Sequence, residues 1–475
     1  MNRRRRTRKD RIRQLRIRLA ILLGLVAALI IALVILITSV MGQNRQNTDT
    51  QTAAVSASSV TAVSESVDEE AERAAQEAAR KLAEEKAAQE AEAEKKAEEE
   101  KKAAEEAARL EEEKRLAEEE AARQAEEAAK IDDGTGTTIR ICMVGDLLLH
   151  DAINSTAARA DGTYDYNSLF TNITAELQNY DLRIINEETP CGGPQFGISG
   201  YPSFNGPYEA IDAVANAGFN CVTMATNHML NRGFGPLAST LQYWRTYYPY
   251  VGLVGAYDSF EASEQIYVYQ KDDFRVAVLN YTYGSNAGAE ILGSSDMYWA
   301  VNLLEETSVY YDIQRAKEVA DYVIVCPHWG TEYNIGVDEL QIYWTDRFLE
   351  WGVDLVIGTH PHVIEPMDYR TYGEDHGMLI YYSLGNFVSN QDNAYSMVGG
   401  MADVTIRKNS SGVHLDDFGA KTVITHKALP FTTYMLRDYS PELAPFNMVT
   451  LTDPSFSYEY CVNLSQSIYG DCLKW

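Results

Sequence analysis

The sequence predicts an α/β fold with a layered mixed sheet, preceded by a transmembrane helix and a helical stalk. Three observations indicate this order. Residues 19–41 are apolar and uncharged, and residues 68–130 are almost entirely helix formers; from residue 131 onward, short apolar runs alternate with helix-like stretches. Residues 131–475 are numerous enough to form one large domain with its own apolar core. A formal net charge of -28 excludes binding to nucleic acid through a basic surface.

Residues 19–41 are expected to form a transmembrane helix, because about 20 apolar residues span a bilayer. Residues 1–18 hold ten basic residues and one acidic residue, which should keep this tail in the cytoplasm. The protein should therefore be a single-pass protein of the cell membrane, with its C-terminal domain extracellular. The alternative is a cleaved signal peptide, but the apolar run is longer than a usual signal core and no clear small-x-small cleavage site follows it.

Two segments with different expected stiffness follow. Residues 42–67 are rich in Ser, Thr, Ala and Gln without apolar periodicity, which predicts a flexible linker. Residues 68–130 are Ala, Glu, Lys, Arg and Gln, with many Glu/Lys pairs three or four residues apart, which predicts a solvated helical stalk. Leu82, Leu110 and Leu116 are too few for a leucine seam, so a coiled coil with an alanine seam is the alternative.

Residues 131–475 are expected to form one layered α/β domain. Apolar runs predict strands, and amphipathic stretches between them predict helices. Two β-rich runs within residues 265–281 predict a hairpin, and hence a mixed sheet. The expected strands are 139–145, 182–185, 219–225, 322–326 and 353–357, and the expected helices are 167–180, 208–217, 309–320 and 339–351.

The six cysteines do not indicate a disulfide framework. Cys142, Cys221 and Cys326 lie in or at the end of apolar runs, where a free thiol packs as a small hydrophobe. Cys461 and Cys472 could pair in an extracellular compartment, which the sequence leaves open.

Polar residues follow five of the predicted strands at the point where each ends. Ligand sites of α/β sheets lie beyond the carboxyl ends of the strands, so these residues should share one rim. His360 and His362 are two apart in a strand-like exit, where alternate residues face the same side. Carboxylate, amide oxygen and imidazole together suit Mn, Fe or Zn. The five segments are GD at 145–146, NEE at 186–188, TNH at 226–228, PHWG at 327–330 and THPH at 359–362.

From about residue 138 to 389, the chain resembles the capsule-biosynthesis protein A (CapA) family, which is associated with poly-γ-glutamate and whose fold is similar to the calcineurin-like metallophosphoesterases. Several ordered motifs over this length make the resemblance specific. The matching motifs are GDLLLH at 145–150, NEETP at 186–190, AGFNCVTMATNHMLNRG at 217–233, CPHWGTEY at 326–333, GVDLVIGTHPHVIEP at 352–366 and YSLGNF at 382–387.

The resemblance implies a metallophosphoesterase-like centre that binds a divalent transition metal, as one or two ions of Mn, Fe or Zn. Glu188 would bridge, and His228, next to the ligand Asn227, would be the catalytic residue that faces the scissile group. The implied metal ligands are Asp146, Glu188, Asn227, His328, His360 and His362.

Two positions depart from the family pattern. Phosphoesterases of this fold begin with Asp-x-His, whereas Asp146 is followed by Leu147 and Leu148, with no histidine before His150. One metal position should therefore lack a ligand, and whether His150 replaces it stays open. Asn231 stands where the family usually has an aspartate, so any role of a negative charge there is lost.

The expected function is that of a membrane-anchored extracellular metal-dependent hydrolase-like protein in capsule or cell-envelope polymer biosynthesis, of the poly-γ-glutamate type. The alternative is a non-enzymatic component that exports or tethers the polymer. The expected partners are the membrane, an anionic envelope polymer and other capsule-synthesis membrane proteins, without nucleic acid.

Overall fold

The computed structural model describes residues 111, 115, 134–294, 296–373 and 376–475. The predicted cytoplasmic tail, transmembrane helix and linker, and nearly all of the predicted stalk, lie outside the described residues. Glu111 and Arg115 are helical. Among the residues that are described, no helix is long and apolar enough to cross a membrane.

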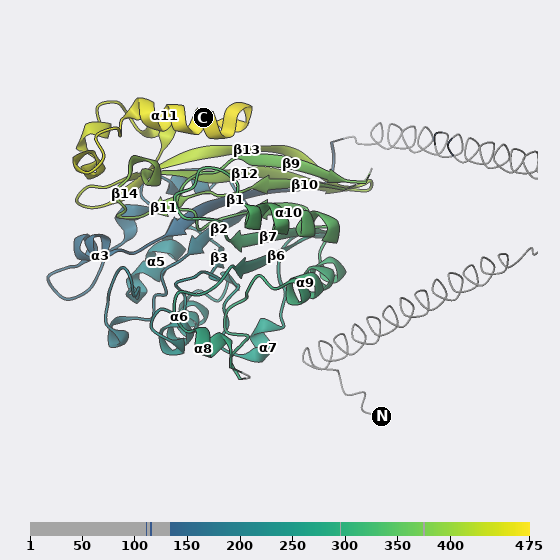
Figure 1. Ribbon diagram of the computed structural model, residues 1–475, viewed down its shortest axis with the longest axis horizontal. Helices are drawn as coiled ribbons and strands as arrows, with labels where there is room; N and C mark the ends of the chain where they lie inside the picture. Colours follow the sequence, from purple (N-terminus) through teal and green to yellow (C-terminus); the bar gives the residue numbers. More distant parts are fainter. Residues whose placement is uncertain (1–110, 112–114, 116–133, 295, 374–375) are drawn as a thin grey trace, which may run out of the picture. The chain divides into compact units, whose positions relative to one another are not determined.

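Two β-sheets form the centre of the domain (Figure 1). The first sheet has the order β14-β13-β12-β1-β2-β3-β4, with β11 paired to β1 and β15 to β13. Its β1-β2-β3-β4 part is parallel, and its β1-β12-β13-β14 part is antiparallel. Its strands are β1 (Thr137–Leu147), β2 (Leu182–Glu187), β3 (Cys221–Thr223), β4 (Gly252–Val254), β11 (Asn386–Val388), β12 (Val398–Asn409), β13 (Gly412–His426), β14 (Thr432–Met435) and β15 (Leu473–Lys474).

The second sheet has the order β5-β6-β7-β8-β10-β9. Strands β5 and β6 form the predicted antiparallel hairpin, β6-β7-β8-β10 is parallel, and β9 is antiparallel to β10. Both sheets are therefore mixed. The strands are β5 (Tyr267–Lys271), β6 (Phe274–Thr282), β7 (Tyr322–His328), β8 (Leu355–Ile357), β9 (Met367–Tyr372) and β10 (His376–Tyr381).

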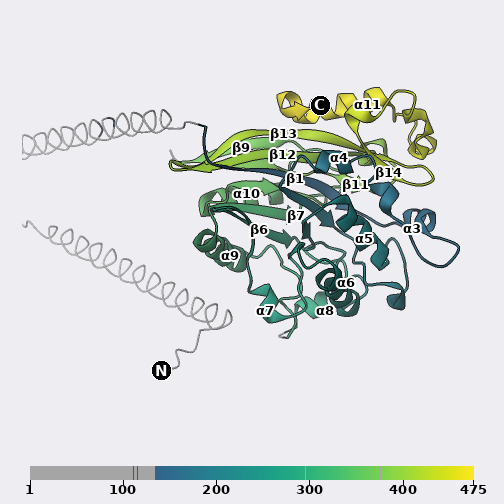
Figure 2. The ribbon, with the colours of Figure 1, turned by 180° about the vertical axis from the view of Figure 1, so that it is seen from behind.

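The described helices connect and cover these strands (Figure 2). The α-helices are α3 (Asp151–Ala157), α4 (Thr174–Leu177), α5 (Tyr208–Ala217), α6 (Phe234–Tyr247), α7 (Phe260–Ser263), α8 (Ala289–Leu292), α9 (Glu306–Val319), α10 (Glu339–Trp351) and α11 (Tyr458–Tyr469). The 3₁₀ turns are η1 (Asn167–Leu169), η2 (Pro194–Phe196), η3 (Ala394–Met397), η4 (Leu436–Asp438), η5 (Ala444–Phe446), η6 (Met448–Leu451) and η7 (Gly470–Cys472).

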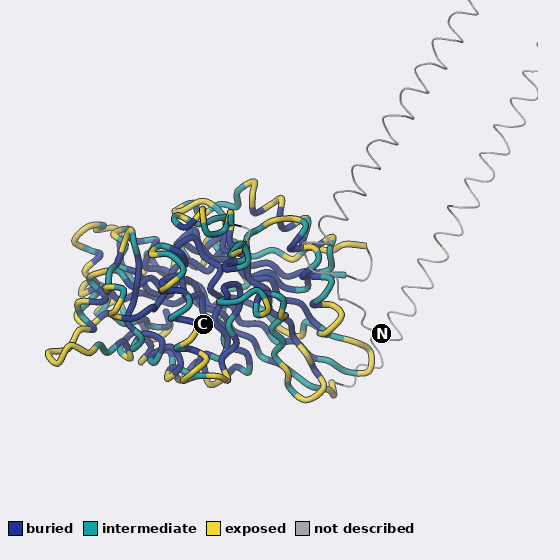
Figure 3. Tube along the Cα trace, turned by 90° about the horizontal axis from the view of Figure 1, so that it is seen from below, coloured by how far each residue is buried: buried dark blue, intermediate teal, exposed yellow. Residues whose placement is uncertain are grey.

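Three apolar cores arrange the domain in layers. Alternate residues of β1 face opposite sides of the first sheet. On one side, Ile141 packs in a core that contains residues of both sheets, such as Ile324 of β7. On the other side, Val144 packs in a core with α5 and α6. A third core joins the outer face of the second sheet to α9 and α10. The order is therefore helices, sheet, sheet, helices, and buried chain occupies the middle while exposed loops lie at the periphery (Figure 3).

Most predicted elements are confirmed, and two need correction. The helices at 208–217 and 339–351 match α5 and α10. The helix predicted at 167–180 is wrong in extent, because η1 and the short α4 are separated by a turn; Thr171 and the β-branched Ile173 in this stretch are weak helix formers. The strand predicted at 219–225 is reduced to β3; after it, the Met224 amide still donates to the Val254 carbonyl of β4, whereas the Ala225 amide donates to the Asn280 Oδ1.

Helix α10 and the strand after it lead directly to the predicted rim. Asp338 begins the helix with a capping box, in which its side chain accepts from the amide of Gln341 and the Gln341 side chain accepts from the amide of Asp338. Gly352 ends the helix at a φ of 82°, a left-handed conformation that glycine adopts without steric cost. The chain then enters β8, which leads to residues 359–362.

All six cysteines are free thiols. Cys142, Cys221 and Cys326 are buried, as the apolar pattern predicts. Cys461 and Cys472 do not form a disulfide, so the pairing that the sequence left open is absent from this structure.

Candidate metal centre

The six predicted ligand residues lie where strands of both sheets end. Asp146 is near the end of β1, Glu188 directly follows β2, Asn227 follows β3, His328 ends β7, and His360 and His362 follow β8. Each of the six is at most 3% exposed. The strand ends therefore deliver the predicted donor atoms into one buried region between the two sheets.

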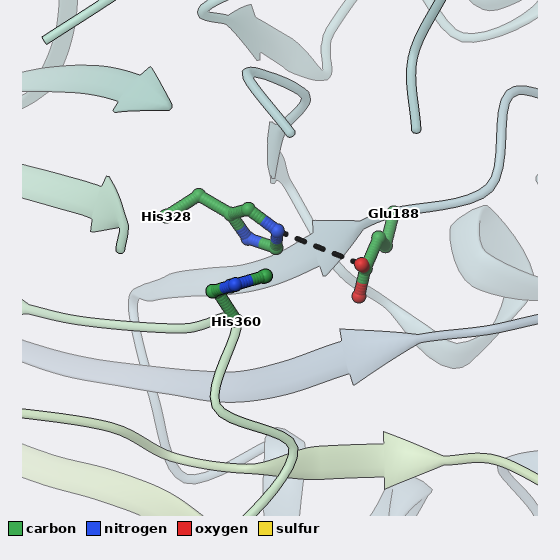
Figure 4. A group of neighbouring side chains, drawn as sticks. All are labelled: Glu188, His328 and His360. Carbon is green, nitrogen blue, oxygen red and sulfur yellow. Dashed lines mark ion pairs between the residues drawn. The ribbon is translucent and has the colours of Figure 1, made fainter. Parts of the chain in front are cut away.

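These side chains form two overlapping groups that could hold a metal ion. The first group is Glu188, His328 and His360 (Figure 4), and the second is Asp146, Glu188 and His362. Within each group the potential ligand atoms lie within 4.8 Å of one another. Glu188 belongs to both, which is the place that the family resemblance gives to a bridging ligand.

The Glu188 carboxylate is buried among nitrogen atoms without being hydrogen-bonded. Neither of its oxygens has a hydrogen-bond partner among the described residues. Its Oε1 lies 3.5 Å from the His328 Nε2, and its Oε2 lies 3.9 Å from the His362 Nδ1. Burial, and then the negative charge of Asp146, raise the pKa of Glu188 well above its usual value. A buried carboxylate of this kind needs a cation to compensate its lost hydration.

The two other donors of the first group are neutral imidazoles. Burial lowers the pKa of His328 to about 4 and the pKa of His360 well below its usual value. The His328 Nε2 lies 2.8 Å from the Asn227 Oδ1, and its Nδ1 lies 3.0 Å from the Thr359 hydroxyl. The His360 Nδ1 has no partner in the described part of the chain. Neutral imidazole is the form that binds metal, so this donor set fits a divalent cation, which would replace the hydrogen bond between the His328 Nε2 and the Asn227 Oδ1.

Asp146 and His362 of the second group are already hydrogen-bonded. The Asp146 Oδ1 accepts from the Asn186 Nδ2 at 2.9 Å, and its Oδ2 accepts from the His362 Nδ1 at 3.0 Å and the His360 amide at 3.3 Å. Burial lowers the pKa of His362, but Glu188 and Asp146 outweigh it and raise that pKa to about 9.

The backbone at the two histidines differs from the expected strand-like exit. His360 and His362 have φ values of 101° and 60°, in the left-handed region that costs a non-glycine residue about 1–3 kcal/mol. Hydrogen bonds hold this geometry, since the Asn386 side chain donates to the His362 carbonyl and the Tyr333 amide to the Pro361 carbonyl. Both imidazoles still face the centre, but through a left-handed turn, so the reasoning from strand alternation was wrong.

His228 lies beside the first group with its orientation fixed. Its Nδ1 is 2.7 Å from the Asn231 Oδ1, which also accepts from the Phe204 amide at 3.2 Å. An amide oxygen only accepts, so the His228 Nδ1 donates, and the Nε2 lone pair of the neutral ring points toward Glu188 Oε1, 3.9 Å away. Burial lowers the pKa of His228 to about 4. Asn231 thus orients the ring without adding a charge.

His150 belongs to neither metal group in the described residues. Its Nδ1 accepts the Asn390 amide at 3.2 Å, and its ring meets Phe204 edge-on. The structure therefore places His150 in the wall of the site.

The sequence did not reveal two residues that position the candidate ligands. Asn186 holds the Asp146 carboxylate and itself accepts from the Thr223 hydroxyl. Gly145 allows β1 to approach the following loop, because a Cβ there would lie 1.8 Å from the Gly385 carbonyl oxygen. The only feature of the sequence that could have pointed to Asn186 and Gly145 is that they stand in the same strand-end motifs as the candidate ligands Glu188 and Asp146.

The amino-acid sequence of this chain is similar to bacterial capsule-synthesis proteins. The family model of the bacterial capsule synthesis protein PGA_cap matches residues 140–391. A CG45076 coiled-coil family model matches residues 34–139. The capsule biosynthesis protein CapA of Bacillus anthracis is 27% identical over 289 residues, which cover 58% of this chain and 66% of that protein. The PGA biosynthesis protein CapA of Bacillus subtilis (strain 168) is 27% identical over 224 residues, which cover 47% of this chain and 55% of that protein.

The chain thus spans less than two thirds of the length of these curated relatives. Two solved structures are also similar. The calcineurin-like phosphoesterase YfkN from Bacillus subtilis has 14% identity and a TM-score of 0.36, covering 61% of this chain and 91% of that chain. The NAD nucleotidase NadN of Haemophilus influenzae has 12% identity and a TM-score of 0.38, covering 72% of this chain and 57% of that chain.

Proposed function

The chain belongs to the bacterial capsule synthesis protein family PGA_cap, and from this premise we propose that it acts in the biosynthesis of a capsule or cell-envelope polymer of the poly-γ-glutamate type. Two curated relatives are named for capsule and PGA biosynthesis. The matched residues 140–391 contain all six candidate ligands and His228. The domain would work outside the cell, held by residues 19–41 as a single-pass anchor, with an anionic envelope polymer and other capsule-synthesis membrane proteins as partners.

We propose further that the centre is a metal-dependent hydrolytic site. The observation that carries this proposal is the Glu188 carboxylate, which is buried, has no hydrogen bond from the described residues and is shared by both candidate groups. Asp146, His362, His328, His360 and Asn227 would complete the ligand set for one or two ions of Mn, Fe or Zn. When bound, such ions lower the pKa of a water molecule and polarise the scissile bond.

The chain's own residues supply proton transfer and orientation. His228 presents a lone pair at Nε2, where it can take a proton from the attacking group and return it to the leaving group. Asn231 keeps the ring in this tautomer. Tyr283 and Tyr333, about two-fifths exposed, lie against the rings of His360 and His362.

The second candidate is a non-enzymatic role in polymer export or tethering. The observation that favours it is the absence of the Asp-x-His histidine, since buried Leu148 takes that place. In this case the same site would hold a polyanion without cleaving it.

Metal-dependent turnover separates the two roles. The purified full chain would be incubated with poly-γ-glutamate, and separately with an activated phosphate ester, with and without Mn²⁺ or Zn²⁺. A hydrolase releases product only with metal, and His228→Ala abolishes release while the control variant His414→Ala, altered in the β13 hairpin, retains it. Absence of product from both compounds under all metal conditions, with capsule formation still dependent on the centre, would favour tethering.

A further inference from the structure

We infer that Arg232 binds a carboxylate of the polymer beside His228 and thereby selects a chain whose units each carry a free carboxylate. This inference rests on the proposed function, because it takes the polymer to be of the poly-γ-glutamate type. In such a polymer, the carbon atom attached to each amide nitrogen also carries a carboxylate. A basic residue that holds this carboxylate would place the nitrogen of the scissile amide near His228, the residue proposed to return a proton to the leaving group.

Arg232 is an exposed basic residue that no acidic residue of the described chain neutralises. Most lysines and arginines of residues 134–475 form ion pairs with Asp or Glu. The chain as a whole has a formal net charge of -28, which repels a polyanion. An unpaired guanidinium at the surface is therefore a place where a carboxylate can bind. The basic residues without an ion pair to the described residues are Arg140, Arg183, Arg232 and Lys317, of which the last two are exposed.

Arg232 lies in the same short loop as His228, four residues further along the chain. The Asn231 amide donates to the His228 carbonyl at 3.0 Å and closes one turn. The Gly233 amide donates to the Leu230 carbonyl at 2.9 Å and closes the next turn. A turn of this kind keeps its first and fourth residues within about 7 Å of each other. Arg232 is therefore at the end of the sheets that carries the candidate metal centre.

The hairpin of residues 199–205 lies along this loop and holds the Arg232 side chain in place. On one arm, the Ser199 hydroxyl accepts a hydrogen bond from the Arg232 Nη1 at 2.9 Å. On the other arm, the Phe204 ring meets the His228 ring edge-on, with 4.8 Å between the ring centroids. One hairpin thus supports both the guanidinium and the imidazole, which places the two groups on the same wall of the site.

The rest of the guanidinium is available to a ligand. The described residues give Arg232 no hydrogen bond besides the one to Ser199. A Cβ added at Gly197 would lie 3.8 Å from the Arg232 Nη2, in ordinary contact, so this glycine leaves that side of the guanidinium uncovered. The Nε and Nη2 atoms can then donate two parallel bonds to one carboxylate. Tyr201, 69% exposed in the same hairpin, offers an apolar ring to the methylene groups of the polymer.

Lys317 provides a matched control at the other end of the second sheet. It lies near the end of α9, which leads into the start of β7 at Tyr322, whereas the candidate ligand His328 ends this strand. Its Nζ donates to the Trp351 carbonyl at 3.3 Å. Lys317 therefore shares with Arg232 its exposure and its lack of an ion pair in the described chain, but not its place beside the centre.

Binding of short labelled oligomers to the full chain in detergent tests the inference. Fluorescence anisotropy would be read in the first seconds after mixing, with chelator and with Mn²⁺, for γ-linked oligoglutamate and for its neutral α-methyl ester. Arg232→Gln should weaken binding of the acid oligomer at least about threefold, with a smaller difference at high salt. Arg232→Lys should restore part of the loss, and Lys317→Gln should bind as wild type does. The ester should bind more weakly to wild type, and Arg232→Gln should not weaken it further.

The outcomes separate this inference from the proposed function. Circular dichroism checks folding, and Arg232→Lys, with the ester bound to wild type, still decides the question if Arg232→Gln does not fold. Equal binding of the acid oligomer by wild type and a folded Arg232→Gln would overturn the inference alone, as would an equal loss in Lys317→Gln. Wild-type protein that binds neither oligomer, with or without Mn²⁺, would overturn both the inference and the proposed type of polymer.

Discussion

Replacing Glu188 by Gln should stabilise the metal-free protein and abolish its stabilisation by metal. The wild-type carboxylate is buried with both oxygens lacking partners among the described residues, and its pKa is raised well above the usual value by burial and by Asp146. A neutral amide of nearly the same shape removes the cost of burying this acid. Because Glu188 belongs to both candidate groups, its loss also removes a potential ligand from each of them.

The magnitude follows from the buried charge, because the amide would be as unpartnered as the carboxyl group but stays neutral at every pH. Burying a group without its partners costs about 1–3 kcal/mol and more when the group is charged, so removing the charge should gain at least about 1 kcal/mol, and 1–3 kcal/mol corresponds in a domain of this length to a rise in melting temperature of roughly 1–4 °C. The folded-state pKa is raised, so the wild-type stability is fully present below the unfolded-state pKa and is lost as pH rises through the folded-state pKa. The advantage of Glu188→Gln should therefore grow as pH increases. With metal at 100 times its dissociation constant, wild type gains about 2.7 kcal/mol and the variant gains none.

Thermal unfolding of the full chain in detergent, followed by circular dichroism, would measure these differences. The four conditions are wild type and Glu188→Gln, each with chelator and with saturating Mn²⁺ or Zn²⁺. We expect the variant to melt higher with chelator and wild type to melt higher with metal. A variant that melts lower than wild type in chelator would refute the reasoning that an unsatisfied carboxylate stands at the centre.

Three other predictions concern residues around the site. Burial raises the pKa of Glu187 from a usual 4.5 to about 8, so the contribution of this residue to stability is lost as pH rises between these two values. The variant Glu187→Gln keeps an oxygen that can accept the hydrogen bond from the Trp244 Nε1, and it should raise the melting temperature at pH 8 but not at pH 4. An equal change at both pH values would contradict this. Gly145→Ala should cost about 1–3 kcal/mol by urea unfolding, since the new Cβ would lie 1.8 Å from the Gly385 carbonyl oxygen; an unchanged midpoint would disprove the close approach. Deleting residues 68–130 should leave the melting temperature of the remaining protein nearly unchanged, because this segment lacks an apolar face with which to dock, whereas a large loss would show that it packs on the domain.

The sequence predicted the strand ends well because the signal was local. Each candidate ligand follows an apolar run closely in the chain, so the placement of Asp146, Glu188 and His328 required only the rule that sites lie at the carboxyl ends of strands. The hairpin of β5 and β6 was also encoded locally. The division into two stacked sheets was not, since β1 pairs with β12 from more than 200 residues later in the chain.

The local geometry of the site depended on contacts that no local pattern contains. The left-handed backbone at His360 and His362 is held by the amide and side chain of distant residues, including Asn386. The orienting role of Asn231 became visible only with the Phe204 amide on its oxygen. Such residues are polar, buried and ordinary in sequence, and only the folded chain shows which atom each one serves.

The central claim is that the histidines after β8 bind metal together with Glu188, while His228 serves the substrate. Metal content by mass spectrometry of three purified full-length proteins tests it most directly: wild type, the double variant His360→Ala with His362→Ala, and His228→Ala. The account predicts bound transition metal in wild type and His228→Ala, and none in the double variant, because its remaining oxygen ligands hold such metals poorly. Equal metal in wild type and the double variant would contradict the assignment of the site.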